Sequence, residues 1–315
     1  MAGFPTVTTW RGIDEVPDDL RPTVVTVGVF DGVHRGHQAI LARAREEADG
    51  RGARVVAVTF DPHPAEVVRP GTHPALLASL PRRAALLEHA GADAVLVLHF
   101  SPSLARQTPE EFATLLARRL HAAAVVVGAN FRFGHRAVGT VETLQQLGEA
   151  LGFAVVPVAL AGDGPTWSST YVRQCVAEGD VSAAAEALGR PYRLEGVVVH
   201  GDHRGRELGY PTANLAGEQH AAVPADGVYA GWLERPDGTR YPAAISIGTN
   251  PTFDGSERRV EAYALDRTDL ELYGERVALD FTARLRDTLR FDGVEPLLVQ
   301  IADDVARTRE LTSGE

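Results

Sequence analysis

Two histidines close to three glycines form the most chemically specific segment of the chain. Residues 28–37 read G-V-F-D-G-V-H-R-G-H, so His34 and His37 stand three apart. Glycine lets a backbone approach a ligand closely, and two imidazoles at a helix entrance can donate to the oxygens of one phosphate. Such donors would stabilise a pentavalent phosphorus without a covalent intermediate. The residues predicted to form this phosphate site are Gly28, Phe30, Asp31, Gly32, His34, Gly36 and His37.

A metal site is the rival interpretation of the same segment. Asp31, His34 and His37 are all residue types that ligate zinc, but an H-x-x-H pair still needs a third ligand at a defined position. The glycines around the histidines favour phosphate over metal, because consecutive backbone N–H groups form anion-binding concavities.

A second glycine-rich segment, residues 201–214, reads G-D-H-R-G-R-E-L-G-Y-P-T-A-N. Its glycines and arginines could wrap a polyphosphate, although glycine-rich hairpin loops are common. Thr212 and Asn214 are two apart, so in an extended chain both side chains face one side and can offer oxygen to a hard cation. The predicted phosphate contacts are Gly201, Gly205, Arg206 and Gly209, and the predicted ligands of a hard cation are Thr212 and Asn214.

Two further segments carry polar groups with two interpretations each. Asn130 follows an apolar strand and could read a base or orient a phosphate, while Phe131 and Phe133 could stack on a planar ring or simply pack. A hydroxyl-rich helix start could cap its helix or bind phosphate together with an arginine one turn later. The residues of that helix start are Ser168, Ser169, Thr170 and Arg173.

The first half of the chain alternates strands and helices, which predicts a parallel sheet covered on both faces. The expected strands are 24–29, 54–60, 94–99, 125–128 and 154–158, and the expected helices are 38–48, 81–89, 109–120, 171–177 and 181–188. Pro109 should open its helix, and Asp180 should cap the last one. Ligands of such sheets bind beyond the carboxyl ends of the strands, where residues 28–37 and Asn130 lie.

The second half reads as strands at 197–200, 227–233, 241–247, 259–265 and 277–285, followed by a helix at 295–308. This spacing predicts a small antiparallel barrel or sandwich closed by a C-terminal helix. We therefore expect an α/β domain at 1–188 and a β domain at 189–315.

Composition excludes several function classes. The 315 residues include no lysine, which excludes a Walker A loop, a kinase strand lysine and a Schiff base. The net charge of −11 argues against nucleic acid as the main partner. One cysteine, Cys175, cannot form an internal disulfide, and no export signal or membrane span is evident, so a cytoplasmic protein is expected. The sequence leaves a homo-oligomer open.

The chain resembles the prokaryotic bifunctional riboflavin kinase/FAD synthetase family. Residues 28–37 resemble its G-x-F-D-G-x-H-x-G-H signature, and T-F-D-P-H-P at 59–64, G-A-N-F-R-F-G at 128–134 and S-S-T-Y-V-R at 168–173 resemble three more segments. In the second half G-R-E-L-G-Y-P-T-A-N, G-V-Y-A at 227–230, N-P-T-F at 250–253, V-E-A-Y at 260–263 and D-L-E-L-Y-G at 269–274 match in order. Thr140 departs from the acidic residue that many relatives carry after the glycine.

The resemblance implies fold, reactions and roles. A Rossmann-like nucleotidylyltransferase domain would convert FMN and ATP to FAD and pyrophosphate, and a kinase barrel would first convert riboflavin and ATP to FMN. Glu261 would be the kinase general base, although a glutamate in such a strand more often faces water. Mg²⁺ would be required. The residues that the resemblance assigns to flavin are Asp61, Pro62, His63 and Tyr229.

Two alternatives stay open at the level of sequence. In the first, only one activity is retained and the other half binds flavin or regulates. In the second, the protein stores or senses flavin without turnover, but His34, His37 and Glu261 would then be unnecessary.

Overall fold

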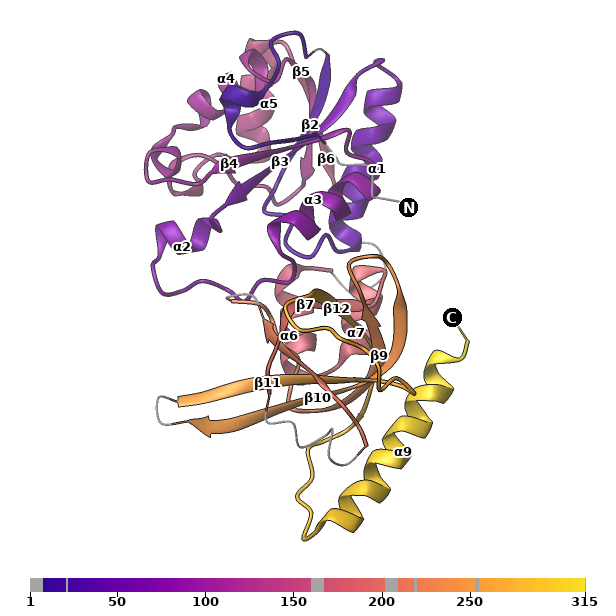
Figure 1. Cartoon of the computed structure of the whole chain (residues 1–315). Coiled ribbons are helices and arrows are strands. Elements are labelled where there is room, and N and C mark those ends of the chain that lie inside the picture. Colours follow the sequence, from indigo (N-terminus) through magenta and orange to yellow (C-terminus); the bar gives the residue numbers. More distant parts are fainter. Residues whose placement is uncertain are drawn as a thin grey trace. The chain divides into compact units, whose positions relative to one another are not determined.

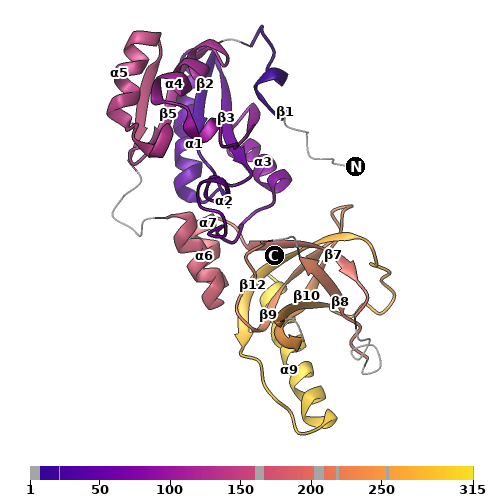
Figure 2. The same cartoon turned by 90° about the vertical axis from the view of Figure 1, so that its left-hand side faces the viewer.

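A computed structural model describes residues 8–20, 22–159, 167–201, 209–217, 220–252 and 255–314, with the side chains of 249–252 and 255–257 left undescribed. The chain divides into two compact units. One comprises Ala2–Pro74 and Leu80–Ser168, and the other comprises Ala75–Ser79 and Ser169–Glu315. Figures 1 and 2 show the helix-covered sheet of the first unit and the barrel of the second.

The first unit is built on a six-stranded sheet in the order β1-β4-β3-β2-β5-β6, with every neighbouring pair parallel. Its strands are β1 (Thr8–Trp10), β2 (Thr23–Val27), β3 (Arg54–Asp61), β4 (Ala94–His99), β5 (Ala122–Gly128) and β6 (Ala154–Val158). Its helices are α1 (Arg35–Asp49), α2 (Pro64–Val68), α3 (Leu80–His89), α4 (Pro109–Arg118) and α5 (Val141–Leu151). The predicted parallel α/β architecture is confirmed.

Both faces of this sheet are covered, which explains the near-continuous apolar runs of its strands. Val25 and Val27 share one core with Phe112 of α4 and Leu144 of α5. Helix α1 contacts β2, β3 and β5, and Val24, which alternates with Val25 along β2, is fully buried as well. The strands are therefore fixed, and their carboxyl ends provide a rigid edge for the loops that follow.

Local signals set the helix ends. Pro109 opens α4 as predicted, and a reciprocal capping box joins Thr108 and Glu111. The sequence interpretation did not identify β1, α2 or α5. Thr140 is the N-cap of α5, where its Oγ1 accepts from the N–H of Thr143. The residue that departs from the family pattern therefore serves as a helix cap.

The second unit contains a closed antiparallel barrel in the order β10-β11-β8-β7-β12-β9. Its strands are β7 (Tyr192–Val199), β8 (Ala213–Gly217), β9 (Gly227–Glu234), β10 (Arg240–Thr252), β11 (Gly255–Ala264) and β12 (Arg276–Arg286). Helices α6 (Ser169–Glu178), α7 (Val181–Leu188) and α9 (Val294–Thr312) belong to the same unit. Closure decides between the predicted barrel and sandwich, and α9 lies beside the barrel as expected (Figure 1).

A glycine permits the closest approach of two barrel strands. Gly231 of β9 lies opposite Phe281 of β12, and a Cβ at Gly231 would stand 2.0 Å from the carbonyl oxygen of Asp280. On the same strands, Arg193 of β7 donates to Asp280 at 2.6 Å and to Glu234 at 3.0 Å. A side chain at position 231 would push these strands apart.

The compact units divide between Ser168 and Ser169, whereas the sequence places the domain boundary at 188/189. Helix α7 begins at the predicted N-cap, where Asp180 accepts from the N–H of Ala183, and ends at Gly189 with φ 72°. It contacts β7 and β12. By contact, α6 and α7 thus belong with the barrel, and the boundary between the two activities stays a prediction.

Candidate functional site

The loop between β2 and α1 is buried and strained. Phe30 and Val33 have positive φ angles of 53° and 42°, and Gly32 between them has 79°. Phe30 and Asp31 are each 1% exposed. Residues other than glycine adopt a left-handed backbone conformation only where the surrounding structure enforces it. Such backbone strain is common at functional sites. The conformation of residues 28–37 is therefore imposed by the fold.

His34 and His37 meet at the start of α1. Their rings stack with centroids 3.7 Å apart and an interplanar angle of 27°. The edge of the Phe30 ring meets His37 with centroids 5.1 Å apart. The sequence predicts that the two rings face one pocket, and the structure brings them into direct contact.

Burial favours the neutral form of His37. Burial lowers the pKa of His37 well below its usual 6.5, and the neighbouring His34 lowers it further. His37 Nδ1 is buried and has no hydrogen-bond partner within the described part of the chain. A neutral imidazole still carries one N–H donor, so His37 can donate a hydrogen bond to a phosphate oxygen without being charged.

Two glycines make room for this arrangement. A Cβ at Gly36 would lie 3.1 Å from the His34 ring and 3.3 Å from the carbonyl oxygen of Trp167. A Cβ at Gly28 would lie 3.1 Å from the Phe30 ring. Both glycines therefore act in packing the loop, in addition to any approach to a ligand.

Arg83 is a buried residue of this site that sequence reasoning missed. It is 3% exposed, and its Nη1 donates to the carbonyl oxygen of Val29 at 2.8 Å and to Thr59 Oγ1 at 3.3 Å. Burial lowers the pKa of Arg83, and the charges of Asp31 and Asp61 oppose this effect. The available signal was an arginine on the apolar stripe of α3, three residues after Leu80 and four before Leu87.

A cavity of about 870 Å³ opens at the carboxyl ends of the strands in the first unit. Its walls are mainly apolar, and Phe131 and Phe133 stack there with centroids 5.5 Å apart. Two predicted site residues, Gly28 and Asn130, line it. The aromatic lining residues are Phe60, Phe100, Phe112, Phe131 and Phe133. This volume and lining suit a large planar ligand.

Four arginines also line this cavity, in a chain whose net charge is −11. They are Arg69, Arg106, Arg132 and Arg136, and all four are exposed. Among the described residues none of them has a carboxylate within ion-pair distance. Guanidinium groups without such partners beside an apolar cavity can bind the anionic end of a ligand.

The segment assigned to flavin from the sequence lies beside the cavity rather than in its lining. Phe60 and Pro64 line it, but Asp61, Pro62 and His63 do not. His63 instead caps α2, where its Nδ1 accepts from the N–H of Ala65 at 3.1 Å. The flavin contacts of Asp61, Pro62 and His63 stay a prediction.

The hydroxyl-rich helix start falls at the division between the units. Ser168 belongs to the first unit, and α6 begins at Ser169 in the second, followed by Thr170. Arg173 Nε donates to the carbonyl oxygen of Ala75 at 2.7 Å within the second unit. The helix start is confirmed, and the phosphate contacts of these residues stay a prediction.

The barrel brings a hydroxyl, an amide and a carboxylate together. Thr212 Oγ1 donates to Glu261 Oε2 at 3.2 Å, and Glu261 of β11 lies directly opposite Asn214 of β8. A Cβ at Gly201 would lie 2.3 Å from Asn214 Nδ2, so Gly201 allows the amide to pack against the backbone. Glu261 is half-buried. Oxygen donors of these types are the ligands that Mg²⁺ prefers.

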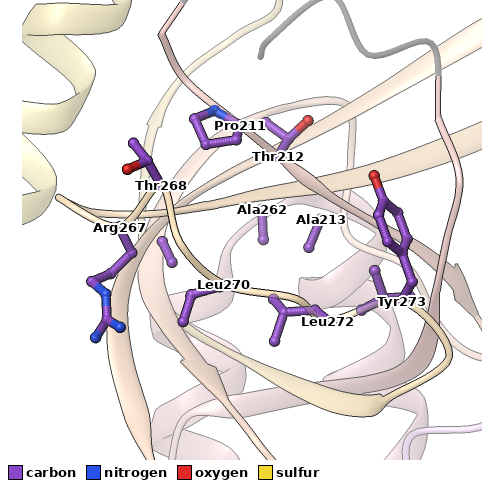
Figure 3. A pocket seen from close by; sticks show the side chains of 11 residues that line it. Pro211, Thr212, Ala213, Ala262, Arg267, Thr268, Leu270, Leu272 and Tyr273 are labelled. Atoms are coloured by element: carbon purple, nitrogen blue, oxygen red, sulfur yellow. The ribbon is translucent and has the colours of Figure 1, made fainter.

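A small cavity of about 40 Å³ adjoins this cluster. Figure 3 shows Pro211 and Thr212 on one side of it and Leu270 and Leu272 across from them. The opposing side chains come from the D-L-E-L-Y-G segment, so two motifs far apart in sequence form one hollow.

The four other residues predicted in the barrel have different outcomes. Gly205 and Arg206 lie outside the described residues. Gly209 has φ 85°, a conformation that favours glycine. Tyr229 is fully buried; its hydroxyl donates to the carbonyl oxygen of Ala225 at 2.6 Å, and it leaves no room for a Cβ at Gly179. In this conformation the side chain of Tyr229 fills the core, and the flavin contact proposed for it stays a prediction.

Comparisons with known proteins identify a family model for each half of the chain. The family model of FAD synthetase matches residues 16–171, and that of riboflavin kinase matches residues 188–312. A bifunctional riboflavin kinase/FMN adenylyltransferase from Pseudomonas fluorescens is 40% identical over 96% of this chain and 97% of its own length. The chain belongs to this bifunctional family. It is a transferase with a FAD synthetase domain followed by a riboflavin kinase domain.

Other similarities extend over the whole chain. The Escherichia coli K12 member of the bifunctional family is 36% identical over 91% of this chain and 92% of its own length. A crystal structure described as a macrolide-efflux protein from Streptococcus pneumoniae superposes with a TM-score of 0.87 and 33% identity, covering 96% of this chain and 99% of that one. Among the described residues of this chain, no helix has the length and apolar character needed to span a membrane.

Proposed function

We propose that the second unit phosphorylates riboflavin to FMN and that the first unit joins FMN and ATP into FAD. The observation that supports this most strongly is that each unit brings together a separate group of polar side chains suited to one of the two reactions. The first has the His34–His37 stack, and the second has Thr212 and Asn214 beside Glu261. The flavin-storage alternative requires neither.

In the kinase reaction, Glu261 takes the proton from the riboflavin 5′-hydroxyl as that oxygen attacks the γ-phosphorus of ATP. The new O–P bond forms as the bond to the β-phosphate oxygen breaks, and ADP leaves. Thr212 holds Glu261 through the hydrogen bond of 3.2 Å. Thr212 and Asn214 would also hold Mg²⁺, which supplies charge neutralisation on the phosphates when bound. Phosphate contacts are proposed for Gly201, Gly205, Arg206 and Gly209.

In the adenylyl transfer, a phosphate oxygen of FMN attacks the α-phosphorus of ATP, and pyrophosphate leaves. His34 and His37 donate to the phosphate oxygens as negative charge develops. Gly28, Gly32 and Gly36 bring the backbone close to the phosphates, while buried Phe30 and Asp31 hold the loop. Asn130 contacts ATP or its base from the cavity side. For Ser168, Ser169, Thr170 and Arg173 an ATP contact rests on the resemblance of their segment alone.

The cavity of about 870 Å³ is the proposed flavin site of this reaction. Its aromatic walls suit the isoalloxazine ring, and the arginines that line it suit the phosphates. The proposed setting is the cytoplasm, with small-molecule substrates and no nucleic-acid or membrane partner; a homo-oligomer remains open.

The test is chromatography of flavins over time after purified protein is mixed with riboflavin, Mg²⁺ and ATP. FMN should appear first and FAD later, and omission of Mg²⁺ should stop both. His34→Ala should lower FAD formation by about 10²–10³, as loss of an oxyanion-type donor does, while FMN formation continues in the same preparation. FMN without FAD from the wild-type chain would leave only the kinase, and unchanged riboflavin would overturn the proposal.

A further inference from the structure

Gln107 places a hydrogen-bond acceptor without a partner beside the large cavity of the first unit. It lies between the short 3₁₀ turn Leu104–Arg106 and Thr108, the N-cap of α4, and it lines the cavity. Its backbone is satisfied, because its N–H donates to Leu104 at 3.1 Å and its carbonyl accepts from His135 at 2.7 Å. Its side-chain Oε1 is buried and accepts no hydrogen bond from any described residue.

Such an acceptor is costly unless something else satisfies it. A buried polar group left without a partner costs about 1–3 kcal/mol, and native proteins keep few of them. The lining residues Leu104, Phe112 and Phe133 offer no side-chain donor, and none of the other described lining residues donates to Oε1 in this conformation. Oε1 is buried in this conformation, and a rotation of the carboxamide toward the adjoining cavity of about 870 Å³ would let it meet a polar edge of a ligand.

We propose that Gln107 is a specificity-determining residue that reads the pyrimidine edge of the isoalloxazine ring in the adenylyl-transfer site. The ring N3–H donates to Oε1, and the amide nitrogen donates to a flanking ring carbonyl. This inference rests on the proposed function, in which FMN occupies this cavity. A leucine of similar size could pack there, but it could not pair with the imide.

An adenine ring also carries an N–H donor beside an acceptor. The position of Gln107 in the fold distinguishes the flavin from the adenine. The loops that we assign to ATP follow β2 and β5, and they contain the histidine pair and Asn130. Gln107 lies on the segment that follows β4, with β3 between β4 and β2 in the sheet. Phe60, near the end of β3, and Phe100, directly after β4, also line the cavity. They supply aromatic surface for a ring larger than adenine.

The experiment measures FAD formation by the full-length protein at saturating MgATP with FMN or 3-methyl-FMN, whose N3 carries no hydrogen. In the wild type, methylation should raise the KM by about tenfold or more, because a site that pairs with an N–H group rejects the analogue that lacks it. Gln107→Leu should raise the KM for FMN about tenfold, leave kcat within about twofold, and nearly abolish the methylation penalty.

Matched controls separate recognition from folding. Gln145→Leu removes an amide from an exposed position on α5 and should leave both KM values unchanged. The ligand-free Gln107→Leu protein should melt at the wild-type temperature or above, because the substitution removes an unsatisfied buried acceptor. Gln107→Glu keeps the acceptor and provides a second variant, whose methylation penalty should persist.

Each outcome decides something. An equal methylation penalty in wild type and Gln107→Leu overturns the role of Gln107. A parallel series with ATP and N6,N6-dimethyl-ATP checks the adenine, and if Gln107→Leu changes discrimination there instead, the flavin assignment is overturned. A wild-type chain that makes no FAD overturns the proposed function itself, whereas normal FAD synthesis with an unchanged penalty overturns only this inference.

Discussion

At the scale of single residues, the hydrogen-bond partners of each polar side chain determine what that side chain can do in the two sites. Glu261 illustrates this in the barrel, because it accepts a hydrogen bond from Thr212 and lies opposite Asn214. A carboxylate held in this way can accept a proton in a fixed direction, which general-base catalysis requires.

Glu261→Gln should lower FMN formation by about 10²–10⁴, because the amide keeps the shape but cannot take the proton. FAD formation from supplied FMN should continue at the wild-type rate. Both products are measured in one preparation by chromatography. Near-normal riboflavin phosphorylation by this variant would show that Glu261 is not the base.

His37 gives a prediction of the pH dependence of stability. Its folded pKa lies below 6.5, so below that pH the unfolded chain binds a proton that the folded protein does not. The contribution of His37 to the unfolding free energy should therefore be present in full above pH 6.5. It should fall as the pH drops below this value, by at most about 1.4 kcal/mol per pH unit.

His37→Gln should remove this contribution. Melting temperatures of the first unit between pH 7.5 and 5.5 should then fall less steeply in the variant than in the wild type. Equal slopes for the two proteins would mean that His37 protonates alike in the folded and unfolded states.

At the scale of elements, glycines at close strand contacts decide whether the barrel can close. Gly231 and Gly248 offer a matched pair on neighbouring strands β9 and β10. A Cβ at Gly231 would lie 2.0 Å from a carbonyl oxygen, whereas a Cβ at Gly248 meets nothing within 4 Å.

Gly231→Ala should destabilise the second unit by about 3 kcal/mol or more, because backbone must move to relieve the overlap. Gly248→Ala should change stability by less than about 0.5 kcal/mol, as surface substitutions usually do. Urea unfolding monitored by tryptophan fluorescence compares the stabilities of the two variants. FAD formation from FMN checks that the first unit stays folded and active in both. Equal stabilities would show that the barrel tolerates a side chain at position 231.

At the scale of the whole molecule, the helices that precede the barrel take part in its core. Val181 and Leu188 of α7 are at most 2% exposed, and Gly179 lies against the hydroxyl of the buried Tyr229. The proposed kinase mechanism, in contrast, uses Thr212, Asn214 and Glu261, which come from the barrel alone.

Fragments 188–315 and 169–315 should therefore both phosphorylate riboflavin, and the longer one should be more stable. Burial of α6 and α7 accounts for the difference, since each fully buried apolar side chain contributes about 1.5–3 kcal/mol. Thermal melts and FMN production compare the fragments. A folded 169–315 fragment without kinase activity would contradict the independence of the barrel.

The sequence by itself determined the order of the two architectures, and the resemblance of its motifs to a known family determined the two chemistries. Spacing of three between His34 and His37, and of two between Thr212 and Asn214, is local information that a helix start or an extended segment converts directly into a shared face. The alternation of apolar runs likewise predicted the parallel sheet, because burial on both faces leaves a period that can be read along the chain.

Only the tertiary structure decided which side chains from distant parts of the chain meet at each site. Arg83 reaches the ends of β2 and β3 because α3 packs there, and Gln107 borders a cavity because loops from several strands end at the same edge. Barrel closure places Tyr229, which its motif assigns to flavin, in the core. These outcomes depend on the order of strands in the sheet and on barrel closure, and neither leaves a periodic signal in the sequence.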